Sequence, residues 1–408
     1  MMAKQSIFFA FILFVCLIFT AEANACTSGI FTGKVTADGR PLLWKHRDTG
    51  EENNRIQFFK GKKYDFLALV NSPDTTGIAW AGTNSVGFSI MNTASYNLKD
   101  DNLKEADKEG ELMFDALSEC KTLADFEKFL SKRKKPLGVE ANFGVTDAEG
   151  GAAYYETNNN TFVKVDVNDL KIAPNGYLIY TNFSYTGRAD QGMGYIRYNT
   201  ANEIVAKKSF MHDITPKWIF DNLSRSFYHS LLGFDLKEEG SFIEKYSGWM
   251  VDQDFIPRKS SSASVVIQGV KSGENPDMTI MWTILGYPPA GIAVPLWVKA
   301  EERQPSFMIR SDNSQNARAC DLALILKQKT FPIKRGNGSR YLKFNEIYNS
   351  KGEGYMQKLS GPQNEIRLIY SDATERWRRE GIDLNELFSL NEKAATVIES
   401  AYSESILF

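Results

Sequence analysis

The residues with the clearest chemical potential lie in the run A-N-A-C-T-S at residues 23–28. Upstream of this run, Lys4 is followed by an apolar segment over residues 7–19, which is typical of a leader peptide. The small residues Ala23 and Ala25 form the A-x-A pattern that signal peptidase reads, and the bond it would cut precedes Cys26. We therefore predict that residues 1–25 are a signal peptide and that the mature protein is exported, either to a periplasm or to the extracellular space.

Cleavage at this bond would give Cys26 a free α-amine beside its thiol. A thiol attacks as the thiolate, and a free pKa of about 8.5 leaves little of it ionised near neutrality. The α-amine, with a reference pKa of about 7.7–8.0, is suited to accept the thiol proton at that pH. Cys26 would then hold a nucleophile and its base in one residue, and would still need oxyanion donors and a nearby positive charge.

The elements that must position Cys26 begin directly after it. Apolar residues over 28–32 and 42–44 flank Asp38-Gly39, a dipeptide typical of hairpin turns. The run K-H-R-D at residues 45–48 ends the second strand of this hairpin. Strand alternation predicts Lys45 and Arg47 on one face, with His46 and Asp48 on the other.

The rest of the chain predicts an α+β protein with an antiparallel sheet core, because strand patterns precede and follow a set of helical patterns. The expected strands cover residues 55–59, 65–70, 77–82, 87–92, 141–147, 152–156, 176–182, 263–269 and 278–285. The expected helices cover residues 110–131, 194–208, 216–226, 227–232, 317–328 and 391–402. We interpret residues 26–297 as a catalytic domain and residues 298–408 as a helical extension packed on it.

Composition narrows the classes of function. The chain is 43% hydrophobic and 24% charged, which is ordinary for a globular protein, and its net charge of -2 does not favour nucleic acid or an anionic membrane surface. The leader's apolar run is shorter than the roughly 20 residues of a membrane span, and no later segment approaches that length. No Cys/His spacing resembles a zinc site and no glycine-rich phosphate loop is present, so we expect neither a metal nor another cofactor. Assembly into a homo-oligomer stays open.

The remaining cysteines allow two interpretations. Cys16 would leave with the leader, so that Cys26, Cys120 and Cys320 remain. In an oxidising compartment Cys120 and Cys320 could form a disulfide with Cys26 left free. Alternatively both are buried thiols, since each lies in an apolar helical pattern.

Cys26 also has an interpretation without chemistry, as a lipid-attachment cysteine of an anchored binding protein. Lipidation would block both its amine and its thiol. Ala23 stands where a lipobox usually has leucine, and no flexible Ser/Gly tether follows Cys26, so we favour the nucleophile. A third class, an enzyme that pairs Cys120 or Cys320 with His229, has no supporting local motif.

Several stretches, in this order along the chain, resemble the choloylglycine hydrolase and penicillin acyltransferase-like group of N-terminal nucleophile hydrolases. Cys26-Thr-Ser with its hairpin is similar to the start of these enzymes, and N-S-V-G-F-S-I-M-N at residues 84–92 is similar to their Asn-x-x-Gly strand. Further similar stretches are the D-A-E-G hairpin at 147–150, Thr181-Asn182, the arginine-bearing helix start at 187–197, and closing strands at 261–269 and 281–288. The resemblance covers the chain from Cys26 to about residue 295.

The resemblance implies a four-layer αββα sandwich and assigns roles residue by residue. Cys26 would be the nucleophile and, through its amine, the base, and Asp48 would hold the amine or thiol. The side-chain amide of Asn182 and the backbone N–H of Asn92 would form the oxyanion site, and Arg197 would supply positive charge near the thiolate.

One departure concerns the group's Arg-x-x-Asp motif, which here reads Lys45-His46-Arg47-Asp48. Either Lys45 takes the arginine position, or Arg47 does after a local shift, and the two side chains are not interchangeable at a bidentate site. The implied reaction is cleavage of a linear, non-peptide amide through an acyl-thioester, with a small N-acyl amide as substrate. The alternative within this class is an acyltransferase that passes the same acyl group to an amine.

Overall fold

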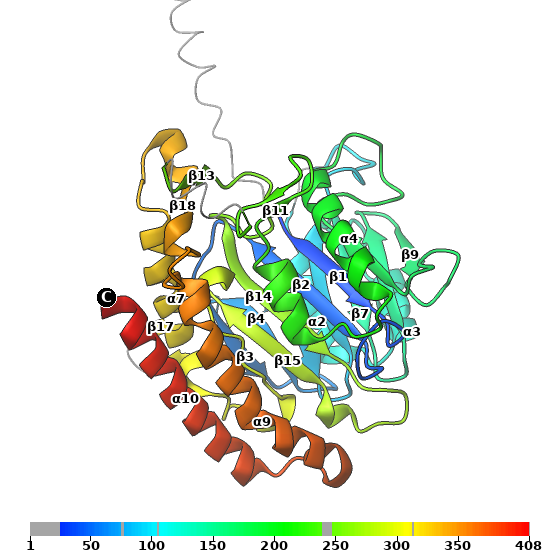
Figure 1. Cartoon of the computed structure of the whole chain (residues 1–408). Helices are drawn as coiled ribbons and strands as arrows, with labels where there is room; N and C mark the ends of the chain where they lie inside the picture. Colours follow the sequence, from blue (N-terminus) through cyan, green and yellow to red (C-terminus); the bar gives the residue numbers. More distant parts are fainter. Residues whose placement is uncertain (1–24, 75–76, 104–105, 239–246, 312–313, 408) are drawn as a thin grey trace, which may run out of the picture.

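The computed structural model describes residues 25–74, 77–103, 106–238, 247–311 and 314–407 (Figure 1). Apart from Ala25, the predicted signal peptide lies outside the described residues. The chain order mixes strands and helices, and two large antiparallel sheets dominate the fold. The α+β class predicted from the sequence is therefore confirmed.

The sheet that begins with the strand after Cys26 has five strands in the order β10-β1-β2-β14-β15. All neighbouring strands in it are antiparallel, and the hairpin β1–β2 pairs Thr27 with His46. β2 is central, so the K-H-R-D run at its end is enclosed by β1 and β14. The strands are β1 (Thr27–Phe31), β2 (Leu42–Asp48), β10 (Tyr177–Tyr180), β14 (Ser261–Gln268) and β15 (Ile280–Leu285).

The second sheet is an antiparallel meander of seven strands in chain order, β3 to β9. Each connection joins neighbouring strands, and the one between β6 and β7 carries two helices. Its strands are β3 (Asn54–Phe59), β4 (Phe66–Asn71), β5 (Ala81–Asn84), β6 (Ser89–Ala94), β7 (Ala141–Thr146), β8 (Ala152–Thr157) and β9 (Phe162–Asp166).

The alternation of side chains along the strands divides the apolar core into three clusters, one between the two sheets and one on the outer face of each sheet. Ile30 and Leu43 point between the sheets, where Leu67 and Met91 of the second sheet meet them. The next residues along the strands, such as Phe31 and Trp44, face the opposite way. Successive side chains of a strand point to opposite faces, and apolar side chains lie on both. Both faces of each sheet are therefore buried.

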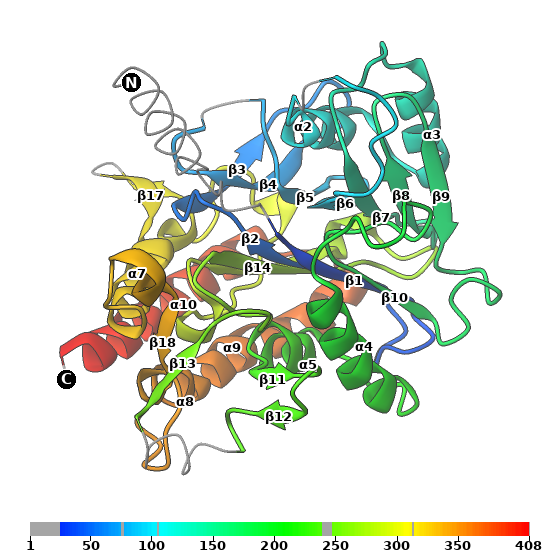
Figure 2. The same ribbon diagram turned by 90° about the horizontal axis from the view of Figure 1, so that it is seen from above.

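Helices cover the two outer faces and complete four layers, as Figure 2 shows. The helices α2 (Glu109–Glu119) and α3 (Leu123–Lys132) pack on the seven-stranded sheet. The helices α4 (Tyr195–Ser209) and α5 (Pro216–Ile219), the latter followed by a π-helical turn (Phe220–Ser224), pack on the five-stranded sheet. The αββα sandwich that the resemblance implied is the observed fold.

Two of the predicted helices are wrong in detail. The single helix expected over residues 110–131 is broken between α2 and α3, because Thr122 caps α3 by a reciprocal bond with the third residue, Asp125. The helix expected over residues 227–232 is instead a small hairpin of β11 (Tyr228–His229) and β12 (Phe234–Asp235), which turns through Gly233 at φ 69°.

The C-terminal residues add helices and short strands beside the five-stranded sheet. The helices are α7 (Arg318–Thr330), α8 (Tyr355–Lys358), α9 (Ser360–Glu380) and α10 (Leu384–Leu407). The strands β16 (Arg310–Ser311) and β17 (Ser314–Ala317) pair with each other, whereas β18 (Tyr341–Lys343) pairs with β13 (Trp249–Val251). Trp377 of α9 and Tyr402 of α10 belong to the same apolar cluster as the residues between the sheets. The division at residue 297 stays a prediction.

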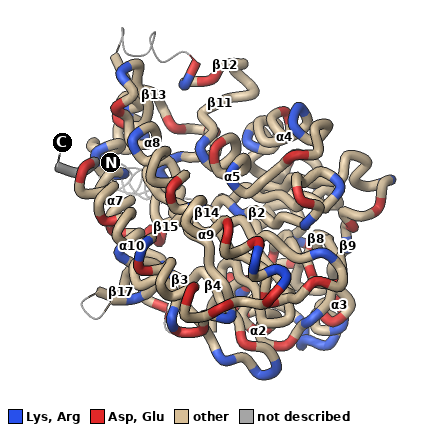
Figure 3. Tube along the Cα trace, turned by 60° about the horizontal axis from the view of Figure 1, so that its bottom comes forward, with Lys and Arg blue, Asp and Glu red and all other residues tan. Residues whose placement is uncertain are grey.

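Positive and negative side chains are interspersed along the chain (Figure 3), in keeping with the net charge of -2. Among the described residues, none of the helices combines the length and apolarity that a membrane crossing requires.

Candidate active site

Cys26 lies immediately before β1 and is 7% exposed. The Arg197 guanidinium, from the first turn of α4, is 2.7 Å from the Cys26 carbonyl oxygen and 2.8 Å from Thr27 Oγ1. Its other nitrogen, Nη2, donates to Asn182 Oδ1 at 2.8 Å. Burial lowers the pKa of Arg197, with Arg258 adding to the effect; a guanidinium nevertheless stays charged at neutral pH. The buried Arg197 guanidinium therefore joins the start of β1 to Asn182, two residues after the end of β10.

Asp48, at the end of β2, is held from two sides. Arg258 Nη2 is 2.6 Å from Asp48 Oδ2, and the same nitrogen donates to the Ala25 carbonyl oxygen at 3.2 Å. Ser261 Oγ donates to Asp48 Oδ1 at 2.6 Å. The backbone oxygen of Asp48 lies 4.0 Å from Cys26 Sγ. The carboxylate is thus linked through Arg258 to the peptide bond that joins Ala25 to Cys26.

His46 supports this carboxylate from the same face of β2. Its Nε2 is 2.8 Å from Ser261 Oγ, and since that hydroxyl donates to Asp48, it accepts the proton of His46 Nε2. Burial lowers the pKa of His46 to about 4, although Asp48 opposes the shift, so the imidazole is neutral near pH 7. His46 therefore orients the Ser261–Asp48 pair without adding charge.

Lys45 faces the space between the sheets, opposite to His46. Its Nζ donates to Asn92 Oδ1 and to the Trp80 carbonyl oxygen, both at 2.7 Å. Burial lowers the pKa of Lys45 to about 8, and a negative charge at Cys26 works against that shift. Lys45 thus ties Asn92 of the seven-stranded sheet to β2 and is close enough to Cys26 to sense its charge.

Arg47 shares the face of Lys45, as strand alternation predicted. Its guanidinium carbon is 5.0 Å from the centroid of the Trp80 ring, and its Nη2 donates to Asn71 Oδ1 at 2.6 Å. Burial lowers the pKa of Arg47, and a charge at Cys26 is the largest opposing influence. The buried Nη1 atom of Arg47 has no hydrogen-bond partner among the described residues.

Asn182 is fully buried and fixed at both ends of its side chain. Its Oδ1 accepts from Arg197, and its Nδ2 donates to the Ala94 carbonyl oxygen at 3.0 Å. Ala94 follows Asn92 on β6, so Asn182 bridges the two sheets beside Cys26. The roles of Asn182 and Asn92 as oxyanion donors stay a prediction.

A cavity of about 220 Å³ lies beside Ala25, the residue before Cys26. Ala25, Arg197 and Arg258 contribute to its wall, together with Gly194, which precedes α4. The last residue of the predicted signal peptide therefore borders an open space. Within the described ranges, no group of His, Cys, Asp and Glu side chains is arranged to hold a metal ion.

Two further residues at this site were not predicted, Arg258 and Ser261. Both come from the segment that enters β14, and they reach Asp48 only because β14 pairs with β2. No local pattern marks them, since P-R-K-S-S at residues 257–261 is typical of a polar turn. Cys120 and Cys320 are free buried thiols in two different apolar clusters and lie outside this site.

The chain has no match among family models, and none among curated proteins. It is similar to the solved structure of a Caenorhabditis elegans N-acylethanolamine-hydrolyzing acid amidase ortholog, with 14% identity, a TM-score of 0.37, and coverage of 60% of this chain and 92% of that one. It is also similar to a conjugated bile acid hydrolase from Clostridium perfringens, with 12% identity, a TM-score of 0.37, and coverage of 68% and 93%. A penicillin V acylase from Agrobacterium tumefaciens follows at 13% identity and a TM-score of 0.31, with coverage of 66% and 86%. At these identities and TM-scores the likeness carries no inference about activity.

Proposed function

We propose that this chain is an exported hydrolase of linear, non-peptide amides whose nucleophile is Cys26, exposed as the mature N-terminus by removal of residues 1–25. The observation that carries the proposal is the placement of the Ala25–Cys26 bond. Arg258 binds the Ala25 carbonyl oxygen and Arg197 binds the Cys26 carbonyl oxygen, so the scissile bond lies between two fixed cations. Loss of Ala25 leaves the new α-amine beside Asp48, which Arg258 already contacts.

The proposed reaction begins with proton transfer from the Cys26 thiol to its own α-amine. The thiolate attacks the amide carbonyl carbon, and the tetrahedral intermediate expels the amine, which takes a proton from the α-ammonium. The acyl-thioester is then attacked by water, with the α-amine again accepting the proton, and the carboxylic acid leaves. Each proton that is removed returns to a leaving group, so no cofactor is required.

The charges around Cys26 favour such a reaction. Lys45, Arg47 and Arg197 are buried cations near Cys26, and they supply positive charge beside the proposed nucleophile. Asn182 and Asn92 lie on opposite sheets, and hydrogen bonds to Arg197 and Lys45 hold them. A site fixed by such contacts before the substrate binds is the arrangement that oxyanion stabilisation requires. We assign the unpartnered Nη1 of Arg47 to the substrate rather than to the fold.

The burial of Cys26 speaks against the lipid-anchor alternative. A lipidated cysteine must present its acyl chains to a membrane, whereas Cys26 is 7% exposed and its carbonyl oxygen is hydrogen-bonded inside the protein. A free N-terminal amine and thiol at this position are compatible with the surrounding polar groups.

The test is hydrolysis of a panel of N-acyl amides by mature Cys26→Ala and Cys26→Ser proteins, with Cys120→Ala as the matched control in a buried thiol outside the site. We expect no hydrolysis by Cys26→Ala, unchanged hydrolysis by Cys120→Ala, and an acyl adduct on the wild-type Cys26 peptide after acid quenching. Full hydrolysis by Cys26→Ala would refute the proposal. Added amines then measure how the acyl-enzyme divides between hydrolysis and acyl transfer.

A further inference from the structure

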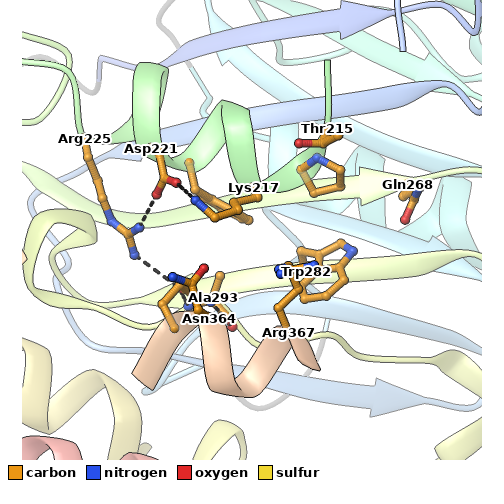
Figure 4. Close-up of a pocket in the computed structure, with 12 residues that line it drawn as sticks. Thr215, Lys217, Asp221, Arg225, Gln268, Trp282, Ala293, Asn364 and Arg367 are labelled. Atoms are coloured by element: carbon orange, nitrogen blue, oxygen red, sulfur yellow. Dashed lines mark hydrogen bonds and ion pairs between the residues drawn. The ribbon is translucent and has the colours of Figure 1, made fainter. Parts of the chain in front are cut away.

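A second cavity, of about 330 Å³, lies on the outer face of the five-stranded sheet (Figure 4). Its walls come from α5 and the turn after it, from β15, and from α9 of the C-terminal region. Small-molecule sites range from about 300 to 1,000 Å³, so the cavity is large enough for a ligand. None of the residues that line it belongs to the site around Cys26.

Part of the lining of this cavity is apolar. Pro216, Phe220 and Trp282 supply the apolar surface. Trp282 stands on the outward face of β15 and packs against the cluster that contains Trp44. Its Nε1 atom is buried without a hydrogen-bond partner among the described residues. The Trp282 ring therefore offers a ligand apolar surface, while its N–H is enclosed by the protein.

The cavity is also lined by cations. Lys217, Arg225 and Arg367 line it, against the single carboxylate of Asp221. Asp221 is shared by Lys217 at 2.5 Å and Arg225 at 2.9 Å, as the dashed lines in Figure 4 show. Three cations thus face one anion, which leaves the cavity with an excess of positive charge.

Arg225 and Arg367 differ in what they can offer a ligand. Arg225 is committed to the fold, because it also donates to the Pro288 and Gly291 carbonyl oxygens and to Gln363. Arg367 is exposed on α9 and makes no ion pair with any described residue. It is therefore the lining cation with the fewest competing partners for a bound anion.

We propose that this cavity is a binding site, separate from the catalytic centre, for a small amphipathic carboxylate. The aryl or acyl group of the ligand lies on Trp282 and Phe220, and its carboxylate binds Arg367. Since β15 and α9 both line the cavity, the bound ligand joins the sheet to the C-terminal helices and stabilises the folded state.

The test is calorimetric titration of the full mature protein with 4-phenylbutyrate, and with 4-phenylbutanol as its uncharged match. We expect saturable binding of the carboxylate and a loss of affinity of about tenfold or more in Arg367→Gln, as a charge-assisted hydrogen bond contributes. Arg379→Gln is the matched control, because Arg379 is exposed near the end of the same helix. Trp282→Ala removes the aromatic surface on which the aryl group lies, and we expect severalfold weaker binding.

The proposal would be overturned by a lack of saturable binding, by equal binding of the alcohol and the carboxylate, or by an affinity that Arg367→Gln leaves unchanged. Thermal unfolding of each variant without ligand checks that the fold is intact. The site does not depend on the chemistry of Cys26. The same titration of Cys26→Ala is therefore expected to give the wild-type affinity, and binding that disappears in that variant would place the ligand at the catalytic centre instead.

Discussion

The Nη1 atom of Arg197 lies 2.7 Å from the carbonyl oxygen of Cys26. The same guanidinium binds Thr27 and Asn182, so the position of the proposed nucleophile depends on one side chain from another element. A cation placed in this way can hold a newly cut N-terminus in its productive position after residues 1–25 are gone.

We predict that Arg197→Met lowers kcat/KM for amide hydrolysis by about 10²-fold, because a shift of the nucleophile by about 1 Å has that effect. Arg197→Lys keeps a charge but cannot reach three acceptors at once, so it should recover little of the activity. Steady-state kinetics and thermal unfolding separate the loss of activity from a loss of fold. Wild-type kinetics in Arg197→Met would show that Arg197 does not position the proposed nucleophile.

A substitution at Gly194 tests the position of Arg197 by introducing a steric clash. It has φ 84° at the start of α4, and an added Cβ would collide with Arg197 Nη2 and come within 3.0 Å of Thr181 Cβ. Gly194→Ala should therefore displace Arg197 and lower kcat at least tenfold. Gly233→Ala is the matched control, because Gly233 has φ 69° and nothing lies within 4 Å of the new Cβ. Both variants carry backbone strain, so an equal effect on activity would contradict the prediction.

The lowered pKa of Lys45 leads us to expect that activity declines at alkaline pH. Since burial lowers its pKa to about 8, Lys45 is charged below that pH and neutral above it. We expect kcat/KM to fall as the pH rises through about 8, because the positive charge that faces Cys26 is lost. Lys45→Arg keeps its charge and should move this alkaline fall in kcat/KM, the alkaline limb of the pH profile, to higher pH. An alkaline limb that stays at the same pH in Lys45→Arg would show that another group causes it.

The charged groups that face Lys45 from the surrounding elements are Cys26, Arg47 and Glu109. Glu109 is the necessary control, because burial raises its pKa to about 8 as well. Glu109→Gln should keep the fall in kcat/KM and move it only slightly, to lower pH, because Glu109 is the smallest of these influences on the pKa of Lys45.

Stability gives a second readout of Lys45. An unfolded lysine has a pKa of about 10.4, so between about pH 8 and 10.4 the unfolded chain binds more protons than the folded one. The free energy of unfolding should therefore gain a contribution that rises with pH over this window. Lys45→Met should remove this contribution, measured by denaturant unfolding across that range.

The C-terminal helices reach the site through Lys327 of α7. Its Nζ donates to the Ser261 carbonyl oxygen at 3.0 Å and to Glu52 at 2.6 Å, and Ser261 in turn holds Asp48. We predict that Lys327→Met lowers kcat about tenfold with little change in KM, since Asp48 is misplaced and the substrate surface is untouched. Lys334→Met, an exposed change just beyond the same helix, should have no effect. A variant that loses stability but keeps kcat would limit Lys327 to a structural role.

The sequence predicted those parts of the molecule that local patterns encode. Alternation in β2 placed Lys45 and Arg47 on one face and His46 and Asp48 on the other, as the structure has them. The helix at residues 194–208 was predicted within one residue at each end, as Tyr195–Ser209. In contrast, the break at Thr122 was missed because the apolar period continues through it, and only the capping bond with Asp125 marks the boundary.

The rest of the site depends on contacts between distant residues. Ser261 and Arg258 reach Asp48 across a separation of more than two hundred residues, through the register of β14 on β2. The partners of Arg197 likewise depend on how α4 packs against β1 and β10. A single sequence carries no signal for such pairings, and the ordered motifs supplied only the candidate residues.

The most direct test of the account is the intact mass and N-terminal sequence of the mature, exported protein. We expect a chain that lacks residues 1–25 and begins with an unmodified Cys26. An acylated Cys26, or cleavage at any other bond, would contradict it, because the nucleophile would then lack the free amine that serves as its base.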